Sequence, residues 1–498
     1  MGRCFVMVVL VLCSGFANRM FSGETGSELA ERLEDPSPEK RRSAVRALAK
    51  VGDYKSWKLV LGALGDPEGQ VSDQAQLALG KLDDARVLKA LLSKSGLKAK
   101  EPALRRRAAE CLGRVRLEVD GSDLVSGLND RDGLVRRRLL WSIERLAKRE
   151  LLTGKLAKKL IPAIERRWQG DREPGVRAAA LQALNVIDSA LALELSMKGL
   201  DDRRVEVRLA SLSVAGQSEE LIGELRDRLM HDSSARVRSQ LIEVFERCGN
   251  REGARALVQV MDADPRIRLR WSALDALHRI SGMKYRMKLA PWKAWSERLP
   301  RNWRATRHET SEMQKGASRA FGGMPLISDR VAFLFDLSGS LWRKREDGTT
   351  RKEYADKQLK LALHSLPEGS MFNVIPYTKY SFPWREELVK ANDRNIERAY
   401  KDFEGCTESG QGNFFDAALL ALQDPNVDTI VALTDGAPTG GEIWSLDLMI
   451  PMLLEHNRFQ KVRFDTILVD APKGLHRHWE SLAKESGGRV ISIEANSR

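Results

Sequence analysis

Cysteine and histidine are scarce in this sequence, which has 5 cysteines and 7 histidines among 498 residues. The cysteines form no CxxC pair, and Cys111, Cys248 and Cys406 lie far apart, so neither a disulfide framework nor a zinc knuckle is expected. HExxH, GxSxG and GxxxxGK motifs are also absent, which excludes the usual zinc-protease, serine-hydrolase and P-loop signatures. We therefore expect a protein that is not an enzyme.

Long hydrophobic runs are absent too. The first apolar run, residues 4–12, is about nine residues long, roughly half of what spans a bilayer as a helix. It follows a short basic start and precedes small residues, which predicts a secretory signal peptide over residues 1–17, cut after Ala17. Two alternatives remain open, an N-terminal core segment and a lipid anchor at Cys13, although the bulky Leu12 disfavours the anchor. We expect an exported chain, periplasmic or extracellular, with no transmembrane segment after processing.

Proline and glycine are sparse as well, at 17 and 38 residues, and the hydrophobic fraction of 42% is ordinary. This composition excludes both a collagen-like chain and a disordered one. The length predicts about two to four folded domains.

One phrase recurs between residues 29 and 282. An aspartate is followed five residues later by a usually apolar residue, then usually by an arginine and an amphipathic run rich in Ala and Leu. About eight copies follow one another at roughly 31-residue steps. They begin at Asp35, Asp66, Asp130, Asp171, Asp202, Asp232 and Asp264, with one further copy around Leu104 and Arg105 that lacks the aspartate.

Each copy is long enough for two helices, and such units must stack to bury their apolar faces. We expect the aspartate to cap the second helix and the arginine to reach the turn of a neighbouring repeat. The pattern resembles HEAT-like repeats, of the kind found in phycobilisome-lyase proteins. The resemblance implies an all-α superhelical solenoid that presents a concave surface to partners.

The repeats end in an aromatic and basic stretch, residues 283–303. Trp292, Trp295 and Trp303 stand there among Lys and Arg, a mixture that could stack on nucleic-acid bases. For an exported protein we favour a cap in which the tryptophans cover the open end of the last repeat. The polar residues 304–324 are predicted to be a linker.

From residue 325 to 498 the apolar period changes. Strand-like runs such as RVAFLFD, MFNVIPY and RFDTILV alternate with helical patterns, which predicts a mostly parallel, Rossmann-like sheet covered on both faces. In such α/β folds, ligands bind beyond the carboxyl ends of the strands.

Two of these strand ends carry acids and hydroxyls. VAFLFDLSGS contains Asp336, Ser338 and Ser340, and TIVALTDGAPTGG contains Asp435. Carboxylate, hydroxyl and water oxygens suit a hard cation such as Mg2+. Because the direct ligands would be mostly neutral, the cation could still accept a carboxylate from a partner, which favours adhesion over hydrolysis.

The phrases DLSGS and TDGAPTGG resemble the von Willebrand factor A (VWFA) domain with its metal-ion-dependent adhesion site, over residues 325–498. The resemblance implies that Ser338 and Ser340 ligate Mg2+ or Mn2+ directly, and that Asp336 and Asp435 hold the metal directly or through water.

The family has a further ligand, a threonine in a loop that reads like GGTNIYDAL. Here the loop reads GQGNFFDAA, and Gly412 stands at the threonine position. Asn413, Ser409, Thr407 or a water could supply the missing oxygen. Alternatively, the site is a relic and the fold serves as an interaction platform.

The formal charge of +13 is unevenly distributed. Residues 325–498 hold about 22 Lys and Arg against 26 Asp and Glu, whereas the preceding residues hold about 60 against 43. A basic solenoid attracts anionic partners, such as an acidic protein or an anionic envelope polymer. Export makes specific nucleic-acid binding unexpected.

The sequence thus predicts a secreted or periplasmic interaction or adhesion protein that binds an acidic partner group through a divalent metal, with the solenoid as a second binding surface. The alternative is a metal-independent scaffold that binds anionic partners on the basic HEAT-like face. Insensitivity of partner binding to EDTA would favour this alternative.

Overall fold

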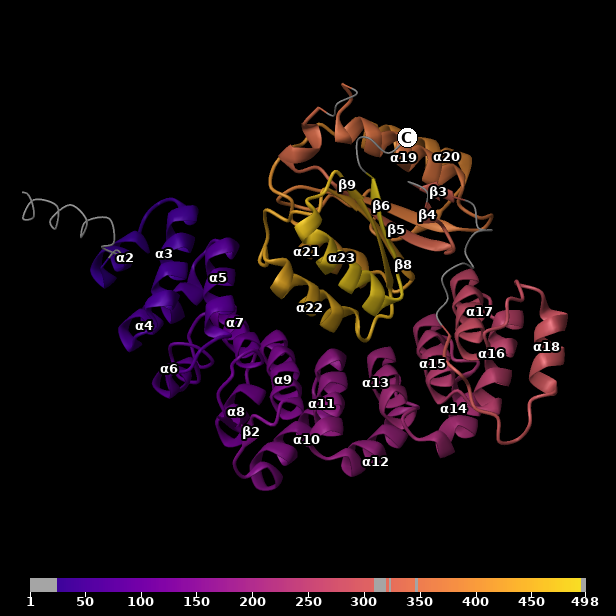
Figure 1. Ribbon diagram of the computed structural model, residues 1–498, viewed down its shortest axis with the longest axis horizontal. Coiled ribbons are helices and arrows are strands. Elements are labelled where there is room, and N and C mark those ends of the chain that lie inside the picture. Colours follow the sequence, from indigo (N-terminus) through magenta and orange to yellow (C-terminus); the bar gives the residue numbers. More distant parts are fainter. Residues whose placement is uncertain (1–24, 309–318, 322–323, 345–347, 494–498) are drawn as a thin grey trace, which may run out of the picture.

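The computed structural model describes residues 25–308, 319–321, 324–344 and 348–493. The predicted signal peptide, residues 1–17, and residues 309–318 of the predicted linker lie outside this part. In the described part, a curved stack of helices is followed by a six-stranded sheet with helices on both faces, as the sequence predicts (Figure 1). No helix in these ranges combines the length and the apolar character needed to cross a membrane.

Two rows of helices form the stack. The inner row consists of the helices that contain the repeated position, which is an arginine in all of them except α5: α3 (Pro38–Val51), α5 (Gly69–Leu79), α7 (Pro102–Leu112), α9 (Gly133–Lys148), α11 (Pro174–Ile187), α13 (Val205–Ala215), α15 (Ala235–Cys248) and α17 (Ile267–Ser281). The outer row consists of α2 (Gly26–Arg32), α4 (Tyr54–Gly62), α6 (Ala85–Leu91), α8 (Gly121–Leu128), α10 (Ile161–Gly170), α12 (Ser189–Gly199), α14 (Ile222–Leu229) and α16 (Arg251–Ala263). A short parallel pair, β1 (Val119–Asp120) and β2 (Leu152–Thr153), joins two repeats at their edge.

The repeated arginine reaches the next repeat, as the sequence predicts. The guanidinium of Arg136 donates two hydrogen bonds, of 2.8 and 2.7 Å, to the carboxylate of Asp171, and Arg105 donates two to Asp130 in the same way. These pairs are largely buried and well aligned, which is the geometry in which breaking an ion pair is costly. The same two-bond contact recurs between Arg41 and Asp66, Arg208 and Asp232, and Arg238 and Asp264, whereas Arg177 makes a single hydrogen bond of 2.7 Å to Asp202 and donates its Nε–H to the carbonyl of Trp168.

Between two of the repeats this arginine–aspartate pair is absent, because the sequence has neither the arginine nor the aspartate at the expected positions. Ser72 occupies the arginine position of one repeat, and its hydroxyl donates to the helix carbonyl of Gly69 instead. The following repeat is the one that lacks the aspartate. There Arg105 donates to the backbone carbonyls of Ala99 and Lys100. The paired loss supports the view that the two residues act as a unit.

The repeated aspartate does not cap its helix as expected. Asp171 accepts the N–H of Glu173, the residue at the N-cap position of α11, and Asp264 accepts that of Arg266 at the start of α17. The carboxylate therefore closes the turn that leads into the helix, an Asx turn, and leaves the first-turn N–H groups to other partners.

An aromatic cap ends the stack at α18 (Leu289–Glu297). Trp292 is fully buried, and Trp295 and Trp303 follow it in edge-to-face contacts with ring centroids 5.6 Å apart. The start of the predicted linker is also packed, because Ala305 N–H donates to Gly249 O at 2.8 Å. Strands β3 (Arg319–Phe321) and β4 (Met324–Pro325) form an antiparallel pair.

The C-terminal sheet has the order β10-β9-β8-β5-β6-β7, with strands β5 (Arg330–Asp336), β6 (Met371–Tyr377), β7 (Val389–Lys390), β8 (Thr429–Thr434), β9 (Arg463–Val469) and β10 (Val490–Ile493). All neighbouring strands are parallel except β7, an edge strand that the sequence analysis missed because it is so short. The topology reverses between β5 and β8, which is where such sheets bind ligands. We call this sheet and the helices that cover it, within residues 330–493, the A-type domain.

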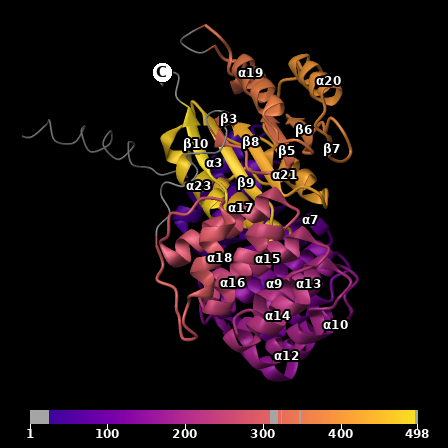
Figure 2. The same cartoon turned by 90° about the vertical axis from the view of Figure 1, so that its right-hand side faces the viewer.

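Helices cover both faces of the sheet. On one face lie α21 (Phe414–Gln423), α22 (Leu446–Asn457) and α23 (Lys473–Ser486), and on the other lie α19 (Arg351–His364) and α20 (Asp393–Glu404). Figures 1 and 2 show the first set between the sheet and the solenoid, and α19 and α20 on the far side.

The A-type domain sits in the concave side of the solenoid (Figure 1). Trp141 of α9 belongs to the same apolar cluster as α22, and Phe459 belongs to the solenoid core. Polar contacts flank this apolar contact: Arg138 to Glu442 at 3.1 Å, Arg137 to the carbonyl of Glu455 at 2.8 Å, and Arg458 to Glu144 at 2.6 Å. Side chains of the inner row thus contact the chain's own C-terminal domain, in which acidic residues outnumber basic ones.

Candidate metal site

The four predicted ligands come together at the carboxyl edge of the sheet. Asp336 is the last residue of β5, and Asp435 directly follows the neighbouring strand β8. Ser338 and Ser340 lie in the turn after β5, where a short 3-10 helix, Gly339–Trp342, begins. The two serine hydroxyl oxygens are 2.9 Å apart. Two adjacent strands thus deliver two carboxylates and two hydroxyls to the point where the topology reverses.

Asp336 is held in place by uncharged groups. Its carboxylate accepts the N–H of Ser338 at 2.8 Å and the hydroxyl of Thr434 at 2.9 Å. The side chain is only 1% exposed, and burial, together with the nearby charge of Asp435, raises its pKa to about 6. A buried carboxylate beside a second carboxylate is stabilised by a bound cation.

A positive charge stands at the outer side of the site. Arg351, at the first position of α19, lies 3.4 Å from Asp435 Oδ2 and 3.3 Å from Asp470 Oδ2. Its guanidinium also donates to the carbonyl of Ser340 at 3.4 Å. The sequence analysis missed this residue, because only the fold brings α19 next to the end of β8.

Gly412 lies where the resemblance places the missing threonine. A Cβ atom at this position would be 3.1 Å from Asp336 Oδ1 and 3.3 Å from the Cβ of Ser338. A side chain here would therefore project directly at the predicted ligands. The sequence position and the spatial position agree, so the site lacks the oxygen that a threonine would supply.

Three residues were proposed to supply the oxygen that the missing threonine would provide. Of these, Asn413 already uses its side-chain oxygen and nitrogen in other hydrogen bonds. Its side chain accepts the N–H of Asp416 at 3.2 Å as the N-cap of α21, and its amide donates to Lys379 O and to Asp416 Oδ2. Ser409 lies close to Gly339, whose added Cβ would be 3.7 Å from Ser409 Oγ. Thr407 is exposed.

The sequence analysis missed the hydroxyl of Thr439, which also lies beside Gly412. Thr439 Oγ1 accepts the N–H of Gly412 at 2.8 Å, and Thr439 N–H donates to Gly412 O at 3.0 Å. The residue belongs to the phrase TDGAPTGG, so the signal was in the sequence. Its significance could not be read there, because the pairing with residue 412 joins two separate loops.

The donor set fits a hard divalent cation. The described residues contain no group of three or more His, Cys, Asp and Glu side chains arranged to hold a metal, so a metal here would depend on serine hydroxyls and water as much as on carboxylates. Ser340 is half-buried, whereas Gly339 and Thr439 are exposed. The site is therefore open to solvent on the side where Ser340 lies.

These features define the class: the chain joins HEAT repeats to an α/β domain of the von Willebrand factor A type, as the sequence predicts. Residues 26–94 match the HEAT repeat family. The chain is 30% identical over 189 residues to mouse inter-alpha-trypsin inhibitor heavy chain 4, a match that covers 35% of this chain and 19% of that protein. It is 27% identical over 146 residues to human von Willebrand factor A domain-containing protein 3B, covering 29% of this chain and 11% of that protein.

Among solved structures, a von Willebrand factor type A protein from Catenulispora acidiphila matches with a TM-score of 0.29 and 17% identity, over 34% of this chain and 39% of that one. The chain spans about a fifth or less of the length of the curated relatives it matches.

Proposed function

We propose that this is an exported interaction protein that binds an acidic group of a protein partner through Mg2+ or Mn2+ in the A-type domain. One observation carries the proposal: Asp336, Ser338, Ser340 and Asp435 converge at the switch point of the sheet, with the serine hydroxyls 2.9 Å apart. The predicted signal peptide over residues 1–17 supports export.

The chain's own residues would prepare the site for the cation. Ser338 and Ser340 offer neutral oxygens, and Thr434 and the Ser338 N–H orient the Asp336 carboxylate. When bound, a divalent ion with few anionic ligands supplies positive charge to which a partner carboxylate can bind. Arg351 would stand beside that carboxylate and add a second favourable charge.

The surface next to the site supports a partner that also carries an apolar residue. Tyr380 and Phe382, in the loop after β6, are 65% and 41% exposed, which is unusual for large hydrophobic side chains. This loop abuts the site, because Asn413 N–H donates to Thr378 O at 2.9 Å. Lys379 lies over the ring of Tyr380. A carboxylate flanked by an apolar side chain would meet complementary groups here.

The competing function, a metal-independent scaffold using the basic HEAT-like face, has less support. The inner row of helices already contacts the A-type domain, so an acidic protein or an anionic envelope polymer would have to displace that domain. We further propose that the protein is not an enzyme and does not bind nucleic acid specifically.

Calorimetric titration of Mg2+ and Mn2+ into the full chain tests the proposal. We expect saturable binding to the wild type and none to Ser338→Ala. The matched control is Ser365→Ala, because the Ser365 hydroxyl bonds only to carbonyls of its own helix α19. Absence of binding to the wild type, or equal binding by all three proteins, would contradict the proposal.

A further inference from the structure

The loop between β8 and α22 connects the candidate metal site to the solenoid. We call residues 435–445 the site loop. It starts at Asp435, passes Thr439, which exchanges two hydrogen bonds with Gly412, and ends at Ser445, the N-cap of α22. Gly441 packs so tightly on the side chain of Asn413 that a Cβ there would overlap it. A displacement of the site loop would therefore move the backbone beside Asp336.

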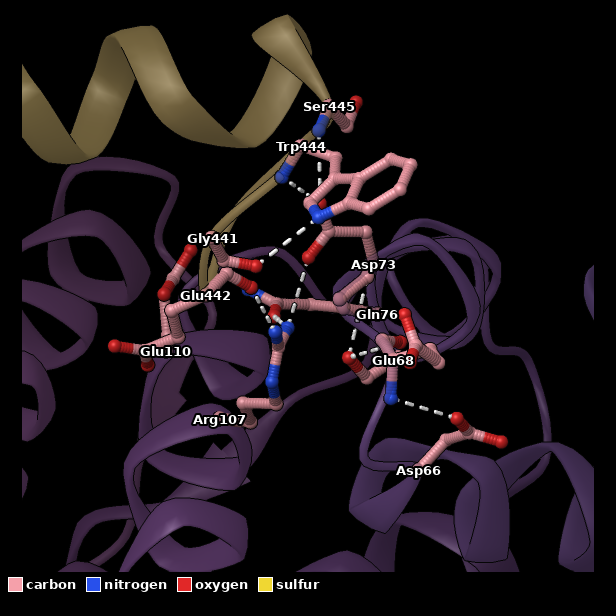
Figure 3. A network of polar contacts seen from close by, with 12 residues as sticks. Asp66, Glu68, Asp73, Gln76, Arg107, Glu110, Gly441, Glu442, Trp444 and Ser445 are labelled. Carbon is pink, nitrogen blue, oxygen red and sulfur yellow. Dashed lines mark hydrogen bonds and ion pairs between the residues drawn. The ribbon is translucent and has the colours of Figure 1, made fainter. Parts of the chain in front are cut away.

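The far end of the site loop is held by two residues of the solenoid (Figure 3). Asp73 of α5 accepts the N–H groups of Trp444 and Ser445 at 2.6 and 2.8 Å. Arg107 of α7 donates to Asp73 at 2.9 Å and to the carbonyl of Glu442. The Asp73 carboxylate thus accepts hydrogen bonds from both the solenoid and the A-type domain.

These contacts fix the backbone that leads into α22. Ser445, the N-cap residue, forms no side-chain capping bond. Asp73 is 2% exposed and accepts the N–H groups of Ser445 and of the residue before it, so it holds the approach to the helix and places a carboxylate near the positive end of the helix dipole. Gly69 allows this approach, because a Cβ there would be 2.6 Å from Gly441 O.

The opposite end of the interface lacks such a connection. Arg236 of α15 donates to Gln460 and to the carbonyl of Asp424, and Lys461 pairs with Glu243 at 2.8 Å. These A-type residues precede β8 and β9, so they lie at the amino edge of the sheet, away from the site. Docking is thus supported at both edges, but the contacts that reach the site loop come from α5, α7 and α9, the last through Arg138, which pairs with Glu442 at 3.1 Å.

We propose that Asp73 and Arg107 are positioning residues for the metal site, so that docking of the solenoid sets the cation affinity of the A-type domain. The effect on affinity depends on the proposed metal-binding function, whereas the effect on the site loop does not. By linkage, binding at the site strengthens docking at α5 and α7 by the same factor. A partner that binds the metal would thereby be sensed by the solenoid.

Hydrogen exchange and Mn2+ titration of the full chain test this, with Arg107→Gln and Arg236→Gln as a matched pair. Each arginine lies on an inner helix and donates to a backbone carbonyl of the A-type domain. Arg107 also donates to the side chains of Asp73 and Gln76, and Arg236 to that of Gln460. We expect Arg107→Gln to speed amide exchange in residues 436–445 and to weaken Mn2+ binding about tenfold, as losses of outer-shell support do. Arg236→Gln should speed exchange near residues 458–461 only.

Asp73→Asn, which keeps the side-chain size, should repeat the effect of Arg107→Gln if the latter folds poorly. Unchanged exchange in the site loop of both variants, or equal loosening by Arg236→Gln, would overturn the proposal. So would a loosened loop with unchanged Mn2+ affinity. If the wild type binds no Mn2+, the metal-binding function fails, and exchange in the site loop alone decides whether the two residues position it.

Discussion

At the scale of single residues, the ion pairs in this chain differ mainly in burial. Arg136 and Asp171 have side chains that are 10% and 1% exposed, whereas Lys198 and Glu194 are 65% and 64% exposed. Buried pairs are costly to break because the remaining charge has no solvent, and exposed pairs contribute little. The repeated arginine and aspartate therefore belong to the core of the solenoid, although both are charged.

Asp171→Ala tests this difference. It leaves the Arg136 guanidinium buried without its partner, so we expect the free energy of unfolding to fall by about 3 to 5 kcal/mol. Glu194→Ala, the control, should change it by less than about 1 kcal/mol. Urea unfolding of the full chain measures both, and similar losses in the two variants would contradict this interpretation.

A second prediction at the scale of single residues concerns Arg351. Its positive charge stands beside Asp435, where it opposes a cation by Coulomb repulsion. Arg351→Gln should therefore bind Mn2+ several-fold more tightly than the wild type, while binding an acidic partner less well. Arg398→Gln, which alters a surface arginine of α20 paired with Asp402, serves as the control. Weaker Mn2+ binding by Arg351→Gln would show that the arginine supports the metal.

At the scale of helices and loops, the contact of the solenoid with the site loop includes one close approach of two backbones. The first residue of α5, Gly69, lies against the site loop, where a Cβ would also be 2.8 Å from the Trp444 side chain. The last residue of α4, Gly62, has open space around it. Both are helical glycines, so the two positions separate a packing effect from a helix-propensity effect.

Gly69→Val should push the site loop away from α5 and weaken docking. We expect a larger radius of gyration by small-angle scattering, and no change for Gly62→Val. If the two variants scatter alike, the approach of α5 to the loop is not needed for docking.

The elements themselves could largely be predicted from the sequence. Their apolar periods, 3.6 residues in the repeats and uninterrupted runs in β5, β6, β8 and β9, are properties of the local sequence. The site ligands could be predicted too, because Asp336 and Asp435 stand at strand ends. The roles of Arg351, Thr434 and Thr439 could not, since each acts through a contact between segments distant in sequence. The docked arrangement was missed for the same reason: the uneven charge was visible, but it was attributed to an external partner.

At the scale of the whole molecule, one histidine reports on docking. His456, at the end of α22, has a pKa well below 6.5, because burial and the charges of Arg137 and Arg138 from the solenoid disfavour its protonation. Its ring packs against Phe415. The docked state therefore binds fewer protons than the undocked or unfolded state below pH 6.5.

The direction in which stability changes with pH follows from this lowered pKa. Stability from a neutral His456 is fully present above about pH 6.5 and is lost as the pH falls toward the folded-state pKa, by up to about 1.4 kcal/mol per pH unit. We expect thermal unfolding of the full chain to shift downward between pH 7 and 5. His456→Gln should flatten this dependence, and an unchanged slope would assign the dependence to other groups.

The most direct test of the account is to locate the cation. Crystals of the full chain grown with Mn2+ should show an anomalous difference peak bounded by the side-chain oxygens of Asp336, Ser338 and Ser340, with Asp435 nearby, and no such peak in Ser338→Ala. A map of the wild type without a peak there at saturating Mn2+, or with its peak elsewhere, would contradict the claim that this A-type domain holds a metal at the end of β5.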